Sequence, residues 1–308
     1  MDKLQESILK VIAYFDIFNY PVTAQEIQCF MDKPCNETNL HYAINELIKE
    51  KIIFRSKEFY SLQWDDTLIQ KRITANTTAL QQVKRAKKIA SFLHWFPYIK
   101  GIAISGSLSK KVADKKSDYD FFIITEQNRL WVSKLFFTLF IKCAKLLGLG
   151  KFFCLNYVVD ESSLEVTEKN IFTATEIVTL IPVHGNELFN RFFAANEWVQ
   201  DFFPNRNNFV NTATEKRYVL ARKFTEWFFN NKAGDKTDDA IMHFFKRRCK
   251  KLMEQKKFTE SGFQIGALMI DKHFCRPYPQ HFQQMILSRH TEKITKIKGN
   301  ISLAPVAL

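Results

Sequence analysis

The chain lacks the cysteine patterns of small disulfide-linked or zinc-stabilised proteins. Its six cysteines include no CxxC pair, which argues against both kinds of framework and fits a reducing compartment. The start, MDKLQESILK, has no basic segment followed by an apolar one, so we expect no signal peptide. The most apolar window, WVSKLFFTLFIKCAKLLGLG, contains three lysines and predicts a buried amphipathic helix rather than a membrane span. We therefore expect a cytoplasmic protein with no membrane contact.

Acidic charge is scarce in two of the four blocks into which the chain divides. The net charge is +13 overall, and it is −4 over residues 1–70, +11 over 71–150, −5 over 151–204 and +11 over 205–308. The two basic blocks are candidate surfaces for anions. A solvated lysine surface without special function explains each block equally well.

The first 65 residues predict a separate domain. Apolar residues recur at helical spacing over 3–18 and 36–51, and a further helix over 22–31 begins with Thr23 and Glu26 placed as a capping box. Two short alternating runs over 52–62 then predict a hairpin. Three helices followed by a hairpin indicate a winged helix-turn-helix domain over 1–65.

Such a domain suggests a DNA-binding regulator, but its charge disfavours that function. The presumed recognition helix carries Glu37, Glu46 and Glu50, and DNA affinity depends on Lys and Arg that neutralise phosphates. The wing supplies the few basic side chains, at Lys51, Arg55 and Lys57. We therefore expect the domain to bind a protein partner, to self-associate or to pack on the rest of the chain, with DNA binding as the weaker alternative.

The remainder predicts an α+β protein in three parts. Residues 66–97 form a basic linker helix that ends at Pro97. Over 98–203, strand, turn, strand, long helix and strand indicate a small mixed sheet that forms the core. Residues 204–308 show mainly helical periodicity and predict a helical C-terminal domain.

The segment SGSLSKKVADKKSDYDFFIIT, which begins at Ser105, carries the clearest chemistry. In a strand, Asp118 and Asp120 would point to the same face, with their Cα atoms about 7 Å apart, a spacing that suits joint ligation of Mg²⁺. Gly106 and Ser107 follow the preceding strand, where a turn can offer N–H and hydroxyl donors to phosphate. The intervening loop adds cations, of which Lys110 and Lys111 are the candidates for binding a polyphosphate. A simple turn with a charge at the strand edge is the structural alternative.

This combination resembles the signature of the polymerase-beta-type nucleotidyltransferase superfamily, and with the N-terminal winged helix it is similar to uncharacterised bacterial members. The resemblance implies two Mg²⁺ ions, an NTP substrate and in-line attack of a hydroxyl at the α-phosphorus with release of pyrophosphate. It makes Asp118 and Asp120 metal ligands, and Gly106 and Ser107 holders of the triphosphate.

Members of that superfamily also take a third carboxylate from a neighbouring strand, where it helps to activate the acceptor hydroxyl. In the strand LNYVVD the candidates for this role are Asn156 and Asp160, which are about 13 Å apart along the strand and cannot both serve one metal centre. Asn156 stands where the acid is expected. Asp160 stands at the strand end, where a cap or turn residue is common.

The sequence therefore predicts a Mg²⁺-dependent transferase that moves a nucleoside monophosphate from an NTP to an unknown hydroxyl acceptor. The alternatives are a catalytically degenerate nucleotide-binding protein and a winged-helix DNA-binding regulator. Glu176, His184 and Arg276 are further polar residues of interest, for which surface, capping or turn roles are at least as common.

Overall fold

The protein is described here by a computed structural model. The structure describes residues 1–112, 118–146, 154–206, 226–227, 229–256, 268–277 and 282–303. None of the helices within these ranges is long and apolar enough to cross a membrane.

The N-terminal unit contains three helices and a small sheet in the order expected from the sequence. Its elements are α1 (Lys3–Asp16), β1 (Val22–Thr23), α2 (Ala24–Phe30), α3 (Glu37–Lys49), β2 (Phe54–Ser56) and β3 (Phe59–Ser61). The strands pair in the order β1-β3-β2, so the hairpin gains a third, two-residue strand. The capping box at Thr23 and Glu26 is confirmed, because each side chain bonds the other residue's backbone N–H.

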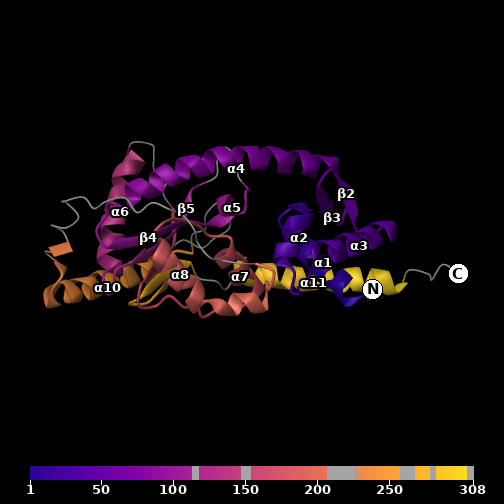
Figure 1. The fold of residues 1–308 in the computed structure, drawn as a ribbon. Helices are drawn as coiled ribbons and strands as arrows, with labels where there is room; N and C mark the ends of the chain where they lie inside the picture. The colour runs from indigo at the N-terminus through magenta and orange to yellow at the C-terminus, as the bar shows by residue number, and fades with distance from the viewer. Residues whose placement is uncertain are drawn as a thin grey trace.

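Helix α4 (Asp66–Leu93) connects the N-terminal unit to the sheet and spans the length between them (Figure 1). Asp65 caps its first turn through Thr67 N at 2.8 Å. Near that end the buried Arg72 side chain donates to Glu26 at 2.7 Å and to the carbonyl oxygen of Pro21 at 3.2 Å. A buried guanidinium with charged and backbone partners fixes the helix on the N-terminal unit.

The core is a mixed six-stranded sheet in the order β7-β4-β5-β6-β9-β8. Its strands are β4 (Ile99–Ile104), β5 (Asp120–Thr125), β6 (Cys154–Asp160), β7 (Ile181–His184), β8 (Leu268–Ile270) and β9 (Phe274–Pro277). Among the described strands, β5 and β6 are the one parallel pair, with helix α6 (Leu130–Leu146) between them in the chain. The α+β class and the mixed sheet expected from the sequence are confirmed.

The structure differs from the sequence-based expectation in the C-terminal part. Within 204–308, expected to be helical, strands β8 and β9 form a hairpin and complete the sheet, and Val158 of β6 pairs with Cys275 of β9. Each strand is only three or four residues long, too short for the alternation of apolar residues to identify it. Strand β7 was missed for the same reason. Part of the span expected to be helical, residues 207–225, lies outside the described residues.

Helices cover both faces of the sheet. On the face of Phe121 and Ile123 lie α4, α6 and α10 (Lys232–Glu254); on the face of Phe122 and Ile124 lie α7 (Ile171–Val178) and α8 (Asn186–Ala195). A 3₁₀ turn, η2 (Glu197–Asp201), follows α8.

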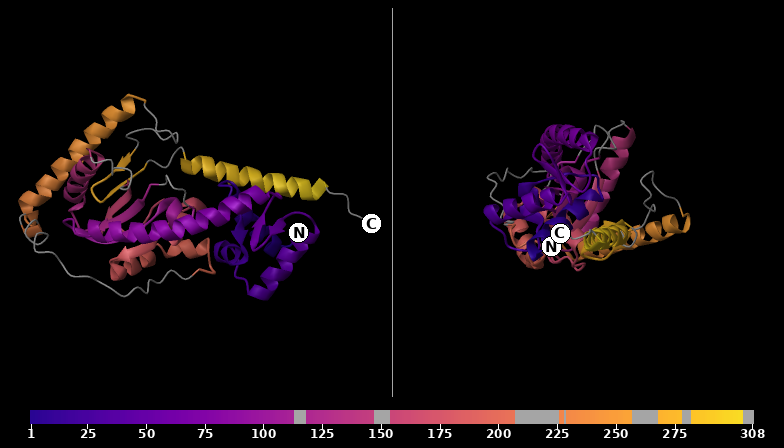
Figure 2. Two further views of the ribbon diagram at one scale, coloured as in Figure 1. Left: turned by 90° about the horizontal axis from the view of Figure 1, so that it is seen from above. Right: turned by 90° about the vertical axis from the view of Figure 1, so that its right-hand side faces the viewer.

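The N-terminal unit packs on the second of these faces and shares its apolar core. Phe30 meets Phe203 edge to face, with ring centroids 5.2 Å apart. Helix α11 (Phe282–Leu303) runs alongside α1 (Figures 1 and 2), and Lys293 and Lys298 form ion pairs with Asp16 and Glu6. The N-terminal unit is therefore held in place both by the apolar core beside the sheet and by the C-terminal helix α11.

A buried aspartate holds α10 against the start of α6. Asp238 is fully buried and accepts a hydrogen bond from Val132 N at 2.8 Å, which serves a free N–H in the first turn of α6. Its second oxygen, Oδ2, has no hydrogen-bond partner among the described residues. Burial raises the pKa of Asp238 to about 6, despite the backbone hydrogen bonds from Val132 and Trp131 that lower it.

We expect this aspartate to make stability fall as the pH rises. Because its pKa is higher in the folded than in the unfolded chain, its contribution is present at about pH 4 and is lost as the pH passes about 6. Relative to Asp238→Asn, the wild type should lose about 2 kcal/mol of unfolding free energy between pH 4 and pH 6. Urea unfolding at both ends of the interval measures the difference, with the half-exposed neighbour Asp239→Asn as the control. A difference that does not change with pH would contradict the assignment.

Candidate active site

The Gly-Ser turn follows directly on the end of strand β4. Ser105 has an extended backbone (φ −126°, ψ −168°) and precedes the single-turn helix α5 (Gly106–Ser109). The Ser105 N–H donates to the carbonyl oxygen of Asp120 at 2.9 Å, which ties the turn to the start of β5. The Ser105 hydroxyl is buried and has no hydrogen-bond partner among the described residues. The turn and the start of the Asp-x-Asp strand therefore lie side by side.

Gly106 is required at this turn by its backbone and by its neighbour. Its φ is +68°, a left-handed conformation in which a Cβ atom is strained. A Cβ on Gly106 would also lie 2.2 Å from Oδ2 of Asp120, far inside van der Waals contact. The absence of a side chain lets the Asp120 carboxylate lie directly against the turn. Two parts of the motif that are separated by a long loop are thus in contact.

The two aspartates occupy the edge of the sheet beside this turn. Strand β5 begins at Asp120, which is half-buried, while Asp118 is exposed two residues before the strand. The alternation of a strand therefore fixes the side of Asp120, which it shares with Phe122, but it does not extend to Asp118. Both carboxyl groups lie at the same end of β5.

The two lysines after the turn have different environments. The Lys110 ammonium lies 2.7 Å from Glu176 of α7 and donates to the carbonyl oxygen of Gly106 at 3.1 Å, so its charge is already partnered. Lys111 is exposed and has a left-handed backbone, with φ of 60°. The lysines at 115 and 116 fall in 113–117, outside the described residues.

Asp160 lies at the opposite end of the sheet from Asp120. Asp120 pairs with Cys154, whereas Asp160 pairs with Thr125, five residues further along β5, or roughly 17 Å. The buried Asp160 carboxylate instead accepts from the N–H of Asn128 at 3.1 Å and lies 2.7 Å from His273 Nδ1. We therefore exclude Asp160 as a candidate catalytic residue, because its carboxylate stabilises the loops at the far end of the strands.

Asn156 occupies an irregular position in β6. The register shifts here, since Phe121 pairs with Leu155 and Phe122 with Tyr157, which leaves Asn156 as the extra residue. The Asn156 side chain lies outside what the structure describes. The strand beside Asp120 therefore has an asparagine where the resemblance implies an acid, in a bulge near the two aspartates.

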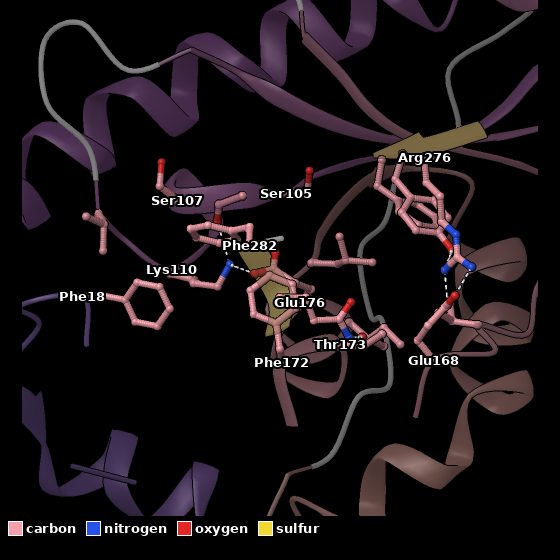
Figure 3. A pocket seen from close by; sticks show the side chains of 18 of the residues that line it. Phe18, Ser105, Ser107, Lys110, Glu168, Phe172, Thr173, Glu176, Arg276 and Phe282 are labelled. Carbon is pink, nitrogen blue, oxygen red and sulfur yellow. Dashed lines mark hydrogen bonds and ion pairs between the residues drawn. The ribbon is translucent and has the colours of Figure 1, made fainter. Parts of the chain in front are cut away.

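A cavity of about 410 Å³ lies beside the Gly-Ser turn (Figure 3). One wall is formed by aromatic residues of the N-terminal unit, among them Tyr14, Phe18 and Tyr20. Further lining residues come from β5, β6, α7 and the start of α11 and are also largely aromatic and aliphatic. The Tyr20 hydroxyl donates to the carbonyl oxygen of Lys110 at 2.9 Å, which joins the N-terminal unit to the loop after the turn.

Two ion pairs line this cavity and neutralise its four charged side chains. Lys110 pairs with Glu176 beside the turn, and Arg276 of β9 pairs through both of its terminal nitrogens with Glu168 (Figure 3). Arg276 Nη1 also donates to the hydroxyl of Tyr157 at 3.2 Å. Burial raises the pKa of Tyr157 to about 12, so this phenol is neutral at physiological pH.

Sequence reasoning undervalued several of these residues. A surface or capping role was favoured for Glu176, and a solvated role was given the same weight as substrate contact for Arg276; both residues line the cavity. Glu168 and Tyr157 were not considered. No spacing rule could find them, because they are brought together only by the sheet. His184 is not part of the cavity wall, and it lies 2.9 Å from the hydroxyl of Ser91 on α4.

The residues at the turn fit a shared magnesium site better than a closed metal cage. Within the described ranges, no group of three or more His, Cys, Asp and Glu side chains can hold a metal ion. Mg²⁺ usually takes one or two protein carboxylates and fills its other positions with water and substrate phosphate. Asp118 and Asp120 supply two carboxylates, and the adjacent turn supplies N–H groups for a phosphate.

Comparison with known protein families identifies the family of the domain that contains this site. A family model described as a nucleotidyltransferase domain matches residues 83–267, which is more than half of the chain. The matched span includes the Gly-Ser turn, both aspartates and strands β4 to β7, while β8 and β9 lie beyond it. No curated protein and no solved structure matches the chain.

Proposed function

Because the chain belongs to the nucleotidyltransferase domain family, whose reaction is nucleotidyl group transfer, we propose that it moves a nucleoside monophosphate from an NTP to a hydroxyl acceptor in a Mg²⁺-dependent reaction. The contact between Gly106 and the Asp120 carboxylate is the observation that carries this proposal. It brings the backbone proposed to bind phosphate and the carboxylate proposed to bind Mg²⁺ together beside the start of β5.

The residues of the turn and of the Asp-x-Asp segment divide into three proposed roles. Asp118 and Asp120 would hold Mg²⁺, while Gly106 and Ser107 would donate hydrogen bonds to the triphosphate, and the exposed Lys111 would add positive charge. Bound Mg²⁺ would neutralise the phosphate charge that develops as pyrophosphate leaves. The protein would contribute mainly by positioning the α-phosphorus against the acceptor hydroxyl. Lys110, whose charge is partnered by Glu176, would shape the cavity rather than bind phosphate.

A second candidate is a protein that binds nucleotide without transferring it. It is favoured by the asparagine at position 156 in β6 and by the distance of Asp160 from Asp120. Without a third carboxylate, activation of the acceptor hydroxyl would be weaker while the binding of Mg²⁺ and NTP would persist. The two candidates therefore share a binding site and differ only in turnover.

The order of its helices and strands supports a winged-helix fold for the N-terminal unit. Its contacts support a role in building the cavity rather than in binding another molecule. It packs on the sheet and on α11, and it forms one wall of the cavity. The outer side of α3 carries the exposed Tyr42 together with acidic side chains, which disfavours DNA as a partner. A salt-sensitive gel shift by the full chain would argue for DNA binding instead.

A nucleotide screen tests the proposed function. Thermal shifts are measured with each of the four NTPs, with and without Mg²⁺, and pyrophosphate release is then followed with candidate acceptors. We expect one or more NTPs to stabilise the chain only when Mg²⁺ is present, and pyrophosphate to appear when an acceptor is added. Binding without pyrophosphate release for any acceptor would favour the second candidate, and no binding of any NTP would refute both.

A further inference from the structure

The cavity beside the Gly-Ser turn opens on the side of the sheet that carries Asp120. Phe122 lines it, and Phe122 lies two residues after Asp120 on β5, so both side chains face the same way. Gly106 and Ser107 form part of the same wall. A molecule in the cavity therefore lies beside Gly106 and Ser107, the residues proposed to hold the triphosphate.

The charge of the cavity does not suit a triphosphate. Its charged lining residues are two cations and two anions, and each cation is already paired, Lys110 with Glu176 and Arg276 with Glu168. A polyphosphate placed here would have to compete with carboxylates for both cations and would also be repelled by them. The occupant is therefore uncharged over most of its surface.

The polar atoms of the wall disfavour a nucleobase as well. A base carries several donors and acceptors on its edges, and each is costly to bury without a partner. Several of the cavity's polar side chains are already occupied: Gln283 donates to the hydroxyl of Thr173 at 3.2 Å, and Tyr20 donates to the carbonyl oxygen of Lys110 at 2.9 Å. The Ser105 hydroxyl, at the Gly-Ser end, has no partner among the described residues and can bond one polar group of an occupant. The rest of the wall offers mainly rings such as Phe18 and Phe172.

We infer that this cavity holds the acceptor, and that the acceptor is an uncharged, largely apolar small molecule with a hydroxyl group at the Gly-Ser end. This inference rests on the proposed transfer function. A volume of about 410 Å³ lies within the range of roughly 300–1,000 Å³ typical of small-molecule sites, which combine apolar walls with a few polar groups. The N-terminal unit selects the acceptor, because Tyr14, Phe18 and Tyr20 form one wall.

Binding of 2-naphthol, an uncharged fluorescent aromatic alcohol, to the full chain tests the inference. Thr173 is a half-buried residue of α7 in the cavity wall, so Thr173→Phe fills the cavity without altering the Gly-Ser turn. Thr173→Val is the matched control, since it loses the same hydrogen bond from Gln283 but adds no volume. We expect Thr173→Phe to weaken naphthol binding at least about tenfold and Thr173→Val to stay within about threefold of the wild type.

The N-terminal wall is tested in the same assay. Phe18→Ala removes a ring from the cavity, and we expect it to lower naphthol affinity several-fold. Tyr42→Ala, an exposed aromatic residue of the same unit outside the cavity, is its control and should bind naphthol as the wild type does. Equal binding by both variants would refute the role of this wall.

Mg²⁺-dependent NTP binding, measured on the same variants, separates the two proposals. We expect it to be unchanged in Thr173→Phe. Loss of NTP affinity in that variant would place the nucleotide in the cavity and overturn the inference, as would a wild type that binds NTP but no naphthol. Naphthol binding without any NTP binding would instead refute the transfer function. In the pyrophosphate assay, apolar alcohols should stimulate release, and stimulation by sugar phosphates alone would contradict the assigned acceptor class.

Discussion

Asp120→Asn is expected to reduce nucleotidyl transfer by at least roughly 10²–10³-fold, because it removes a carboxylate charge at the point where metal and phosphate would meet. The same change should abolish the Mg²⁺-dependent part of NTP binding. Stability should change little, since the substitution keeps the shape of a half-buried side chain at the sheet edge. Transfer, binding and melting temperature are measured on one preparation. Asp118→Asn should behave alike.

Asp160→Asn is the informative control for this result. Asp160 lies on the adjacent parallel strand, but at the far end, where it holds Asn128 N and His273. We expect this variant to lower the melting temperature, because buried hydrogen bonds are lost, and to keep transfer activity per folded molecule. If Asp160→Asn abolished transfer while Asp120→Asn did not, our assignment of the active site to the Asp120 end of the strands would be wrong.

Gly106→Ala is expected to reduce transfer by roughly 10²-fold or more, because a displacement of about 1 Å in the reacting groups has effects of that size. The new Cβ would lie 2.2 Å from Asp120 Oδ2, so the carboxylate or the turn must move. The left-handed φ of +68° adds a stability cost of about 1–2 kcal/mol for a residue with a Cβ. Activity is compared with the unfolding free energy from urea titration.

Gly185→Ala controls for backbone strain alone. Gly185 also has a positive φ, of 82°, and its Cβ would lie 2.5 Å from the carbonyl oxygen of Lys100, away from the Gly-Ser turn. It should destabilise the chain and leave transfer per folded molecule intact. Adding Asp120→Ala to Gly106→Ala should recover part of the stability lost in Gly106→Ala, because the carboxylate no longer meets the Cβ. If the losses of unfolding free energy in Gly106→Ala and Asp120→Ala simply summed in the double variant, the close contact between the two residues would be contradicted.

The local parts of the site could be predicted from the sequence, because they depend on neighbouring residues. The end of an apolar strand followed by Gly106 and Ser107, and the strand that begins at Asp120, were located from apolar runs and turn residues. The contact between Gly106 and Asp120 follows from the antiparallel pairing of β4 with β5. The antiparallel pairing of two strands that follow each other in the chain can be predicted from the sequence pattern.

The rest depends on register and on distant segments. Asn156 and Asp160 were placed on one regular strand, and the shift between Phe121 and Phe122 that makes Asn156 an extra residue leaves no mark in the amino-acid pattern. The cavity joins Tyr14 of α1 to Arg276 of β9, which are brought together because the N-terminal unit packs on the sheet that contains β9. Such long-range contacts follow from the complete fold and not from any short segment.

The most direct test of the account follows the phosphorus atoms of the nucleotide. The wild-type chain is incubated with Mg²⁺, an apolar alcohol and the preferred NTP, labelled in parallel reactions at the α- or the γ-phosphorus. We expect the α-label to appear on the acceptor and the γ-label in pyrophosphate, in equal amounts, with neither in Asp120→Asn. Transfer of the γ-label to the acceptor, or bound NTP that leaves both labels in place, would contradict nucleotidyl transfer by this chain.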